Sequence, residues 1–466
     1  MRVAIGTRLL AGLLGIWAFT MEGSANADQG AVGGPCSSAA AMTAPACSRA
    51  PAAGGNNQSA SALTERGKIY AAQGQNDLAI AAESEAIRLQ PANVMAYLIR
   101  GIAYARKNEL ELALADAKEA VRLNPAFYLA VQFRGASYKA LGQWDNAIAD
   151  DSAALRLKPD DEPAFTQRAT AHEEKGKFAF AAKNAREATA QFGLAVSDAS
   201  EAIRMKPGDW EAFRCRADVE LQQEKNDLAI ADATQALRLA PDFAPALGIR
   251  GLSYTNKHEF DLAIADFTKA IAVLPNDADI RLFRANDYGA QGRYDLAIAD
   301  ATAAIRLKPD FGEAYSLRGR AYEATGKVDL ALADLDAAIR FDPGWAVPLR
   351  ERGGIYARTG RYDKAIGDEN NALRFNPEDE PALVVRGFAY ANKGQTDRAI
   401  ADETGAIALR PNDPDAYLDR SSAYCRAKKF ELAIADEVQA IRLNPVGAGA
   451  HAGAKSTMSK CTITGR

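Results

Sequence analysis

The segment that decides the fold is Asp310 to Pro343, DFGEAYSLRGRAYEATGKVDLALADLDAAIRFDP, because it recurs along most of the 466-residue chain. Its closing proline is found eleven times, at Pro91, Pro125, Pro159, Pro207, Pro241, Pro275, Pro309, Pro343, Pro377, Pro411 and Pro445. Nine of the ten intervals are 34 residues, and the remaining one, Pro159 to Pro207, is 48. A period of this length indicates stacked supersecondary units rather than several globular domains.

Each unit is predicted to form two helices, which we call helix A and helix B. In helix A, Tyr315, Gly319 and Tyr322 lie on one face at i, i+4 and i+7, and a glycine then breaks the helix. In helix B, Ala331 and Ala338 are seven residues apart, and both positions are alanine in all eleven units. Small side chains let helix axes approach closely, and the proline prevents the helix from continuing. One pair alone leaves an apolar face exposed, so neighbouring pairs must stack.

These units resemble tetratricopeptide repeats, over residues 61–445. The resemblance rests on an aromatic, a small residue and a tyrosine in helix A, two alanines in helix B, and the proline. It implies an all-α fold, a right-handed α-solenoid of eleven helix pairs, and a scaffold that holds proteins or peptides in a groove lined by helix A. The chain departs from the pattern at the helix-A tyrosine and at an aromatic position of helix B that Phe267 keeps. The departures are His172, Glu220, Ala301, Glu369, Glu403 and Glu437.

One charged pattern follows the repeat. An arginine precedes the small residue of helix A in every unit, and helix B carries an aspartate in all but the first, which has Ala82. Because the two helices of a pair are antiparallel, we expect these residues to form ion pairs within each repeat. Examples are Arg284 with Asp300 and Arg318 with Asp334. We interpret the pairs as structural; the alternative is an arginine ladder that binds a ligand.

The helix-A positions outside the buried stripe vary between units, as a selective groove would allow. They form apolar clusters in repeats 2, 3 and 10 and a cationic cluster in repeats 8 and 9. The candidate groove residues are Met95, Leu98, Ile99, Ile102, Phe133, Arg320, Arg350, Arg358, Val384, Val385 and Phe388. Apolar patches beside a cationic stretch suit an extended acidic or amphipathic peptide. For each cluster the alternative is variation between repeats or residual core packing.

The 48-residue interval contains a 14-residue insertion, 178–191, in repeat 4. Phe178–Gln191 aligns with Phe192–Met205, and fourteen residues are about four helical turns, so both copies keep their apolar face in phase. We expect helix B of this repeat to project beyond its neighbours or to break near Gly193. The insertion is either a tolerated duplication or a basic element that shapes a partner site, with Lys177, Lys183 and Arg186.

The two ends of the chain differ from the repeats. Residues 1–27 have the pattern of a cleavable export signal, with positive charge, the apolar stretch Leu9–Met21 and a small-x-small site at Ala25 to Ala27. An uncleaved anchor is the alternative. Residues 28–60 are predicted to be a disordered spacer. After export its Cys36 and Cys47 could pair or stay free. Residues 446–466 are predicted to be a flexible tail that leaves the last repeat uncapped and able to self-associate.

Composition excludes several function classes. Lys and Arg total 56 against 60 Asp and Glu, for a net charge of −4, so no nucleic-acid partner is expected. Only three histidines are present, and no catalytic or nucleotide-binding motif holds. We therefore expect no enzyme activity, cofactor, metal or small-molecule substrate.

The sequence favours an exported, non-enzymatic scaffold of bacterial type that binds protein or peptide partners in the periplasm or cell envelope, or is secreted. One alternative is an architectural or assembly factor that bridges envelope proteins through its convex faces and ends. Another is a non-catalytic auxiliary subunit of an enzyme complex.

Overall fold

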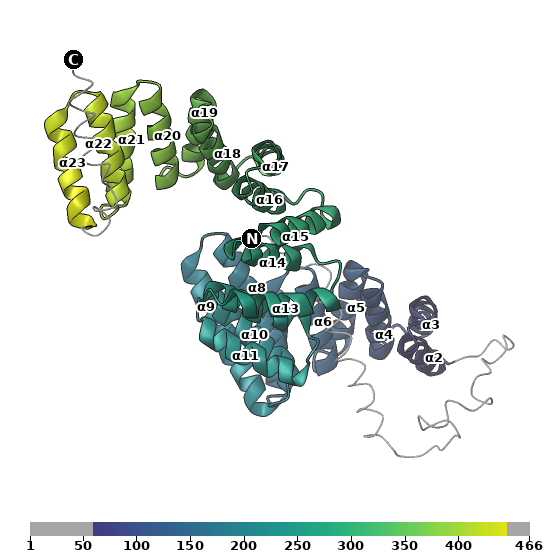
Figure 1. The fold of residues 1–466 in the computed structure, drawn as a ribbon. Coiled ribbons are helices and arrows are strands. Elements are labelled where there is room, and N and C mark those ends of the chain that lie inside the picture. The colour runs from purple at the N-terminus through teal and green to yellow at the C-terminus, as the bar shows by residue number, and fades with distance from the viewer. Residues whose placement is uncertain (1–58, 445–466) are drawn as a thin grey trace. The chain divides into compact units, whose positions relative to one another are not determined.

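The computed structural model describes residues 59–444 of the chain. The predicted export signal, nearly all of the predicted spacer with Cys36 and Cys47, and the predicted tail lie outside the described residues. Within residues 59–444 the chain forms 22 helices and no strand. It divides into two units, one ending at Pro241 and one beginning at Asp242. Figure 1 colours the helices along the chain.

The first unit contains five helix pairs. Their bounds are α2 (Ala60–Ala72) and α3 (Asn76–Leu89), α4 (Val94–Arg106) and α5 (Leu110–Leu123), α6 (Tyr128–Ala140) and α7 (Trp144–Leu157), α8 (Glu162–Ala181) and α9 (Ala185–Met205), and α10 (Trp210–Gln222) and α11 (Asn226–Leu239).

The second unit contains six helix pairs. Their bounds are α12 (Ala244–Asn256) and α13 (Phe260–Val273), α14 (Ala278–Ala290) and α15 (Tyr294–Leu307), α16 (Gly312–Ala324) and α17 (Val328–Phe341), α18 (Ala346–Arg358) and α19 (Tyr362–Phe375), α20 (Glu380–Asn392) and α21 (Thr396–Leu409), and α22 (Pro414–Arg426) and α23 (Phe430–Leu443).

Within each unit every helix packs against the next one along the chain. The paired alanines of helix B, such as Ala331 and Ala338, are fully buried. The small helix-A residue is needed for the same close approach: a Cβ on Gly319 would lie 3.2 Å from Leu335 Cγ and 3.3 Å from the Ala331 carbonyl oxygen. The predicted all-α fold of eleven helix pairs is confirmed.

In every repeat of the described chain, a residue in the left-handed backbone conformation lies in the turn after helix A. Glycine holds this position in six repeats, for example Gly326 with φ 76°. The other five repeats place an L-residue with a side chain there: Asn108, Lys183, Glu224, His258 and Lys428. A residue with a Cβ is strained in this conformation, so these five turns are less favourable than the glycine turns.

Replacing Glu224 with glycine is therefore expected to stabilise its repeat by about 0.5–1 kcal/mol. Glu224 is exposed and has φ 60°, so the substitution removes strain and no buried contact. The matched change of opposite sign is Gly326→Ala, because nothing lies within 4 Å of the Cβ that it adds. Urea unfolding followed by circular dichroism measures both variants. Equal midpoints for the two variants would contradict the argument.

The insertion of repeat 4 agrees with the expectation in part. Helix B was expected to project beyond its neighbours or to break near Gly193. It is longer than its neighbours, with 21 residues in α9 against 14 in α7 and α11, and it does not break, because α9 continues through Gly193. What the sequence did not predict is that helix A lengthens as well, to 20 residues in α8. The turn moves to residues 182–184 because Phe192 packs against Gly176, which keeps helix A and helix B in register. The α8–α9 hairpin is therefore about two turns longer than its neighbours.

Candidate partner-binding surface

The repeated arginine joins three helices. Arg318 of α16 donates from Nε and Nη2 to the two carboxylate oxygens of Asp334 in α17, at 2.7 and 2.8 Å. Its Nη1 donates to Thr302 Oγ1 of the preceding helix B at 3.1 Å. The rings of Tyr315 and Tyr322 lie 5.5 and 5.8 Å from its guanidinium carbon. We call this set of contacts the arginine clasp.

The clasp recurs in both units. Arg284 binds Asp300 at 2.7 and 2.8 Å and Thr268 at 3.0 Å. The acceptor in the preceding helix B is a serine, threonine, asparagine or aspartate: Ser84, Ser152, Ser200, Thr268, Thr302, Asp336, Asn370 and Thr404. Because all three guanidinium nitrogens are engaged in these repeats, the structure favours the structural interpretation of the pairs over the ligand-binding one. Sequence reasoning missed the third bond, although the acceptor recurs with the repeat.

The apolar candidates of repeats 2 and 3 belong to the core. Leu98 and Ile99 are 0% and 1% exposed, and Ile102 and Phe133 are also buried. Met95 is partly buried against the same cluster. Phe133 packs against Gly101 of the preceding helix A. The prediction that Leu98, Ile99, Ile102 and Phe133 line an open groove is wrong, because these side chains face the neighbouring repeat.

The cationic candidates form bridges between successive repeats. Arg320 of α16 lies 3.4 Å from Glu351 of α18, and Arg358 of α18 pairs with Glu323 of α16. The side chains of Arg320 and Arg358 remain 53% and 62% exposed. Arg350 differs, because it lies 3.2 Å from the buried Asp379.

Asp379 also caps α20 by accepting a hydrogen bond from the Ala382 amide. Arg350 therefore supports the start of α20, whereas Arg320 and Arg358 keep much of their surface in solvent.

In repeat 10, too, some of the three candidates are covered by neighbouring residues and one stays exposed to solvent. Val384 and Val385 are half-buried, and Phe388 is 48% exposed. The Phe388 ring makes an edge contact with Tyr362, with 6.4 Å between ring centroids. Arg320, Arg358 and Phe388 lie on the successive A helices α16, α18 and α20, which contact one another in turn. We call these three residues the α16–α20 surface.

A buried charged cluster in repeats 4 and 5 was not predicted. Glu173 of α8 accepts from Lys177 at 2.6 Å and from Arg214 of α10 at 3.0 and 3.1 Å. Lys177 also pairs with Glu174 at 3.0 Å and with Asp218 at 2.7 Å. Burial alone would raise the pKa of Glu173, but Arg214 and Lys177 hold that pKa well below its usual range.

The assignment of Lys177 to a protruding basic element is therefore wrong, since its ammonium is enclosed by carboxylates. Lys183 and Arg186, in and beside the turn, are exposed. The periodic pattern gave no signal for the cluster because its members occupy different repeat positions.

Several carboxyl groups occupy the helix-B position that Phe267 fills with a ring. Glu369 is fully buried, and within the described residues neither of its carboxyl oxygens has a hydrogen-bond partner. A Cβ on Gly353 would lie 2.2 Å from Glu369 Oε1, so the carboxyl packs directly on helix A. Burial raises the pKa of Glu369 to about 9, and burial likewise raises that of Glu403 to about 9. Both groups are therefore protonated at neutral pH.

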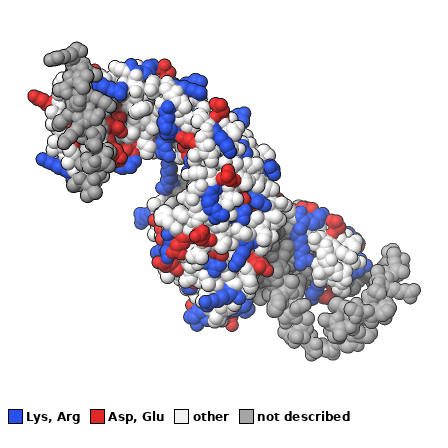
Figure 2. Space-filling view, in the orientation of Figure 1, with Lys and Arg blue, Asp and Glu red and all other residues white. Residues whose placement is uncertain are grey.

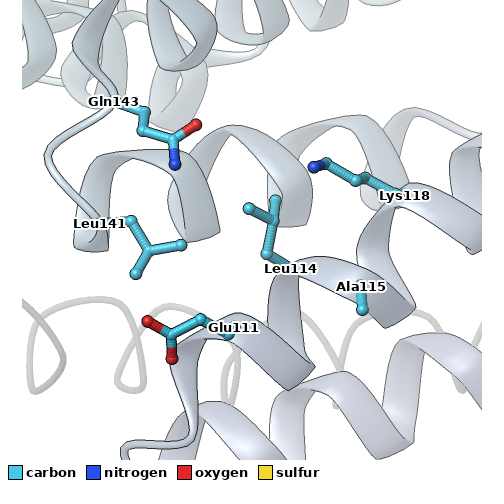
Figure 3. Close-up of a pocket in the computed structure, with 6 residues that line it drawn as sticks. All are labelled: Glu111, Leu114, Ala115, Lys118, Leu141 and Gln143. Atoms are coloured by element: carbon cyan, nitrogen blue, oxygen red, sulfur yellow. The ribbon is translucent and has the colours of Figure 1, made fainter.

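A shallow hollow of about 510 Å³ lies between α5 and the α6–α7 turn. Figure 3 shows its lining, which combines Leu114 and Leu141 with one acidic and one basic side chain, Glu111 and Lys118. The residues that line this hollow do not include a nucleophile beside a general base.

Among residues 59–444 no group of three His, Cys, Asp or Glu side chains is placed to hold a metal ion. No helix in that range is long and apolar enough to cross a membrane.

Figure 2 shows basic and acidic side chains interspersed on the face in view, without a large area of one sign.

The tetratricopeptide-repeat family model matches residues 64–126, 215–279 and 282–344. No curated protein sequence matches the chain.

Solved structures similar to this chain include the Cut9–Hcn1 hetero-tetramer of the APC/C, at 14% identity over 87% of this chain and 96% of that one, with a TM-score of 0.48. Yeast Tom70 is similar at 16% identity over 87% and 97%, with a TM-score of 0.44. MamA is similar at 24% identity over 34% and 94%, with a TM-score of 0.32. The three matched segments are therefore tetratricopeptide repeats by sequence, and the eleven helix pairs of the described residues have the helix-pair arrangement that this match implies.

Proposed function

We propose that this chain is an exported, non-enzymatic scaffold that binds protein or peptide partners in the cell envelope or periplasm. Tetratricopeptide repeats suggest protein–protein interaction, and the proposed location is supported by the export-signal pattern of residues 1–27. The single observation that carries the binding proposal is the α16–α20 surface. There a large aromatic side chain, Phe388 of α20, stays 48% exposed, and the two preceding A helices carry the exposed Arg320 and Arg358.

The chemistry of the α16–α20 surface defines the partner. An exposed phenylalanine gains from burial against an aliphatic or aromatic side chain. Arg320 and Arg358 retain exposed guanidinium surface although each contacts one carboxylate, so a second carboxylate can bind them. An extended peptide with an apolar residue flanked by acidic ones would satisfy both kinds of contact. The surface therefore favours an acidic, amphipathic segment of a partner protein.

A displayed peptide library selected on the full chain is expected to yield acidic peptides that contain an aromatic or aliphatic residue. The variant Phe388→Ser loses one aromatic contact with the peptide, and the variant Arg320→Ser with Arg358→Ser loses both cations. Each variant is expected to bind the selected peptide about tenfold or more weakly than the unmodified chain. Fluorescence anisotropy measures the dissociation constant.

The matched control is Arg374→Ser, which removes an exposed arginine from α19, a helix B of the same unit. This control is expected to bind as the unmodified chain does. Peptides that bind all these variants equally well would contradict the proposed site.

The alternative function, an architectural factor that bridges envelope proteins, is supported by exposed leucines on the B helices. In the second unit Leu262, Leu296 and Leu330 occupy one repeated position and are 49%, 40% and 49% exposed. A regular row of exposed leucines is an apolar surface available for contact with another protein. Polar substitution of the three leucines would separate the alternatives, because it should leave peptide affinity at the α16–α20 surface unchanged and abolish bridging between envelope proteins.

A further inference from the structure

The first repeat lacks the carboxylate that completes the arginine clasp in every later repeat of the described chain. In those ten repeats the clasp arginine donates from Nε and Nη2 to the helix-B aspartate over 2.5 to 2.9 Å. In the first repeat the arginine is Arg66 of α2, and Ala82 of α3 holds the aspartate position. Arg66 Nε is buried, and within residues 59–444 it has no hydrogen-bond partner. The first clasp therefore contains a cation without its anion.

The neighbouring Glu83 does not supply the missing anion. Glu83 is fully buried, and its carboxyl packs on Gly67, where a Cβ would lie 2.2 Å from Glu83 Oε1. Among the described residues neither of its carboxyl oxygens has a hydrogen-bond partner. Burial raises the pKa of Glu83 to about 8, so this carboxyl is largely protonated at neutral pH. The charge of Arg66 is therefore not neutralised by the carboxyl nearest to it in the repeat pattern.

Arg66 also lies on a helix that no preceding repeat covers. In most later repeats, Nη1 of the clasp arginine donates to the preceding helix B, as Arg100 does to Ser84 at 3.1 Å. Helix α2 has no preceding helix B among the described residues. Ile69, one turn after Arg66, is 51% exposed, whereas Ile355 at the same repeat position is 2% exposed. The exposed part of α2 therefore combines a cation that lacks its anion with an exposed aliphatic side chain.

We propose that Arg66, beside Ala82, is a carboxylate-binding site that takes an aspartate or glutamate side chain of a partner protein. A carboxylate suits this arginine because two parallel hydrogen bonds from Nε and Nη2 fit its two oxygens. An acidic side chain suits the site better than a free anion, because an apolar residue next to it can cover Ile69. The site belongs to the first unit and does not depend on the α16–α20 surface of the second unit.

The first measurement adds sodium formate, a free carboxylate, to the full chain, with sodium chloride at equal ionic strength as the reference. Hydrogen exchange of α2 and α3 is expected to become about threefold slower when formate stands at about twice its dissociation constant, because only the folded repeat binds it. Helices α4 and α5 are the internal control, since Asp116 completes their clasp. Equal slowing in α4 and α5 would indicate a general salt effect and overturn the proposal.

Ala82→Asp supplies the missing carboxylate from within the repeat. This variant is expected to slow the exchange of α2 and α3 in chloride and to abolish the effect of formate. Asp116→Ala, the matched change of opposite sense, is expected to make the exchange of α4 and α5 sensitive to formate. Formate protection of α2 that persists in Ala82→Asp would show that the anion binds elsewhere, and the proposal would then be wrong.

A second measurement distinguishes a side chain from a free anion as the source of the carboxylate. A short peptide with acetylated and amidated ends, and with one aspartate between two leucines, is added in place of formate. Measured by the exchange of α2, it is expected to bind about fivefold or more tightly than formate, because it also covers Ile69. Ile69→Ser should remove this gain, and the same peptide with asparagine should not protect α2. Equal affinity of peptide and formate would overturn the assignment to a side chain and leave a free anion as the ligand.

Two occupants from this protein itself are outcomes of the same test. Asp28 is the single acidic residue in the sequence from 28 to 58. An Asp28→Asn chain in which α2 becomes newly sensitive to formate would assign the site to that segment. Dimers that light scattering detects in the unmodified chain and not in Ala82→Asp would assign it to a second copy. Either result would overturn the proposal.

Peptide affinity at the α16–α20 surface should be the same in Ala82→Asp and in the unmodified chain. Failure of the Arg66 site is therefore distinguishable from failure of the proposed function.

Discussion

Asp300→Ala is expected to lower the free energy of unfolding of its repeat by about 3 kcal/mol or more. The Asp300 side chain is 9% exposed and binds Arg284 through both carboxylate oxygens. Its removal leaves a half-buried guanidinium with only Thr268 as a hydrogen-bond acceptor. Hydrogen exchange followed by mass spectrometry should show lost protection in α14 and α15, and in α13, which carries Thr268.

The control for this variant is Glu119→Ala. Glu119 pairs with Arg122 at 2.6 Å, but the two side chains are 33% and 67% exposed, so breaking the pair is expected to cost less than about 1 kcal/mol. An Asp300→Ala chain with unchanged protection and no affinity for the selected peptide would show that the arginine ladder binds a ligand, and the structural interpretation would then be wrong.

The stability of the repeats that contain Glu369 and Glu403 is expected to fall as the pH rises. Burial raises the pKa of each carboxyl from 4.5 to about 9, so the folded chain holds these protons more tightly than the unfolded chain. The contribution to stability is full below about pH 4.5 and is lost progressively up to about pH 9, by at most about 1.4 kcal/mol per pH unit for each carboxyl. Above pH 9 no further loss from these groups is expected.

The surroundings of the two carboxyls reinforce this direction. After burial, the larger influences on Glu369 are the carboxylates Asp368 and Asp379, which raise its pKa, against Arg350 and Arg386, which lower it. For Glu403 the carboxylates of Asp419, Asp402 and Glu380 raise the pKa, and Arg420 lowers it. Hydrogen exchange of α18 to α21, corrected for the intrinsic pH dependence of the exchange rate, measures the effect.

Glu369→Gln with Glu403→Gln should remove most of the pH dependence, because glutamine has nearly the same shape and does not ionise. The matched control is Glu313→Gln, since Glu313 is exposed in the same unit. This control should retain the full pH dependence. A double variant that remains as sensitive to pH as the unmodified chain would refute the assignment to these two carboxyls.

The sequence was sufficient to predict the fold and part of the clasp. The 34-residue period gave the eleven helix pairs, and Arg284 with Asp300 and Arg318 with Asp334 followed from the antiparallel arrangement of one pair. The third bond, from Arg318 to Thr302, crosses between repeats. It therefore depends on the offset between neighbouring pairs, which periodicity alone does not give.

The candidate binding residues were predicted less well. Leu98 and Phe133 are core residues because they pack on one another and on Ala113 and Ala117 of α5, between two successive A helices, a contact that the stripe inferred from one repeat does not include. Arg350 proved to support the start of α20, whereas Arg320, Arg358 and Phe388 remain exposed. A helical pattern identifies which residues share a face, but it does not say how far the neighbouring helix extends over that face.

The sequence by itself determined that this protein is an array of helix pairs, because small residues, alanines and prolines at a fixed period permit little else. It also determined that each helix A after the first carries an arginine whose charge is neutralised within its own repeat. Only the tertiary structure decided which of the variable side chains stay in solvent. It alone placed Lys177 among carboxylates and Glu369 without a hydrogen-bond partner, because burial and hydrogen bonding depend on the neighbouring helices and not on position in the repeat.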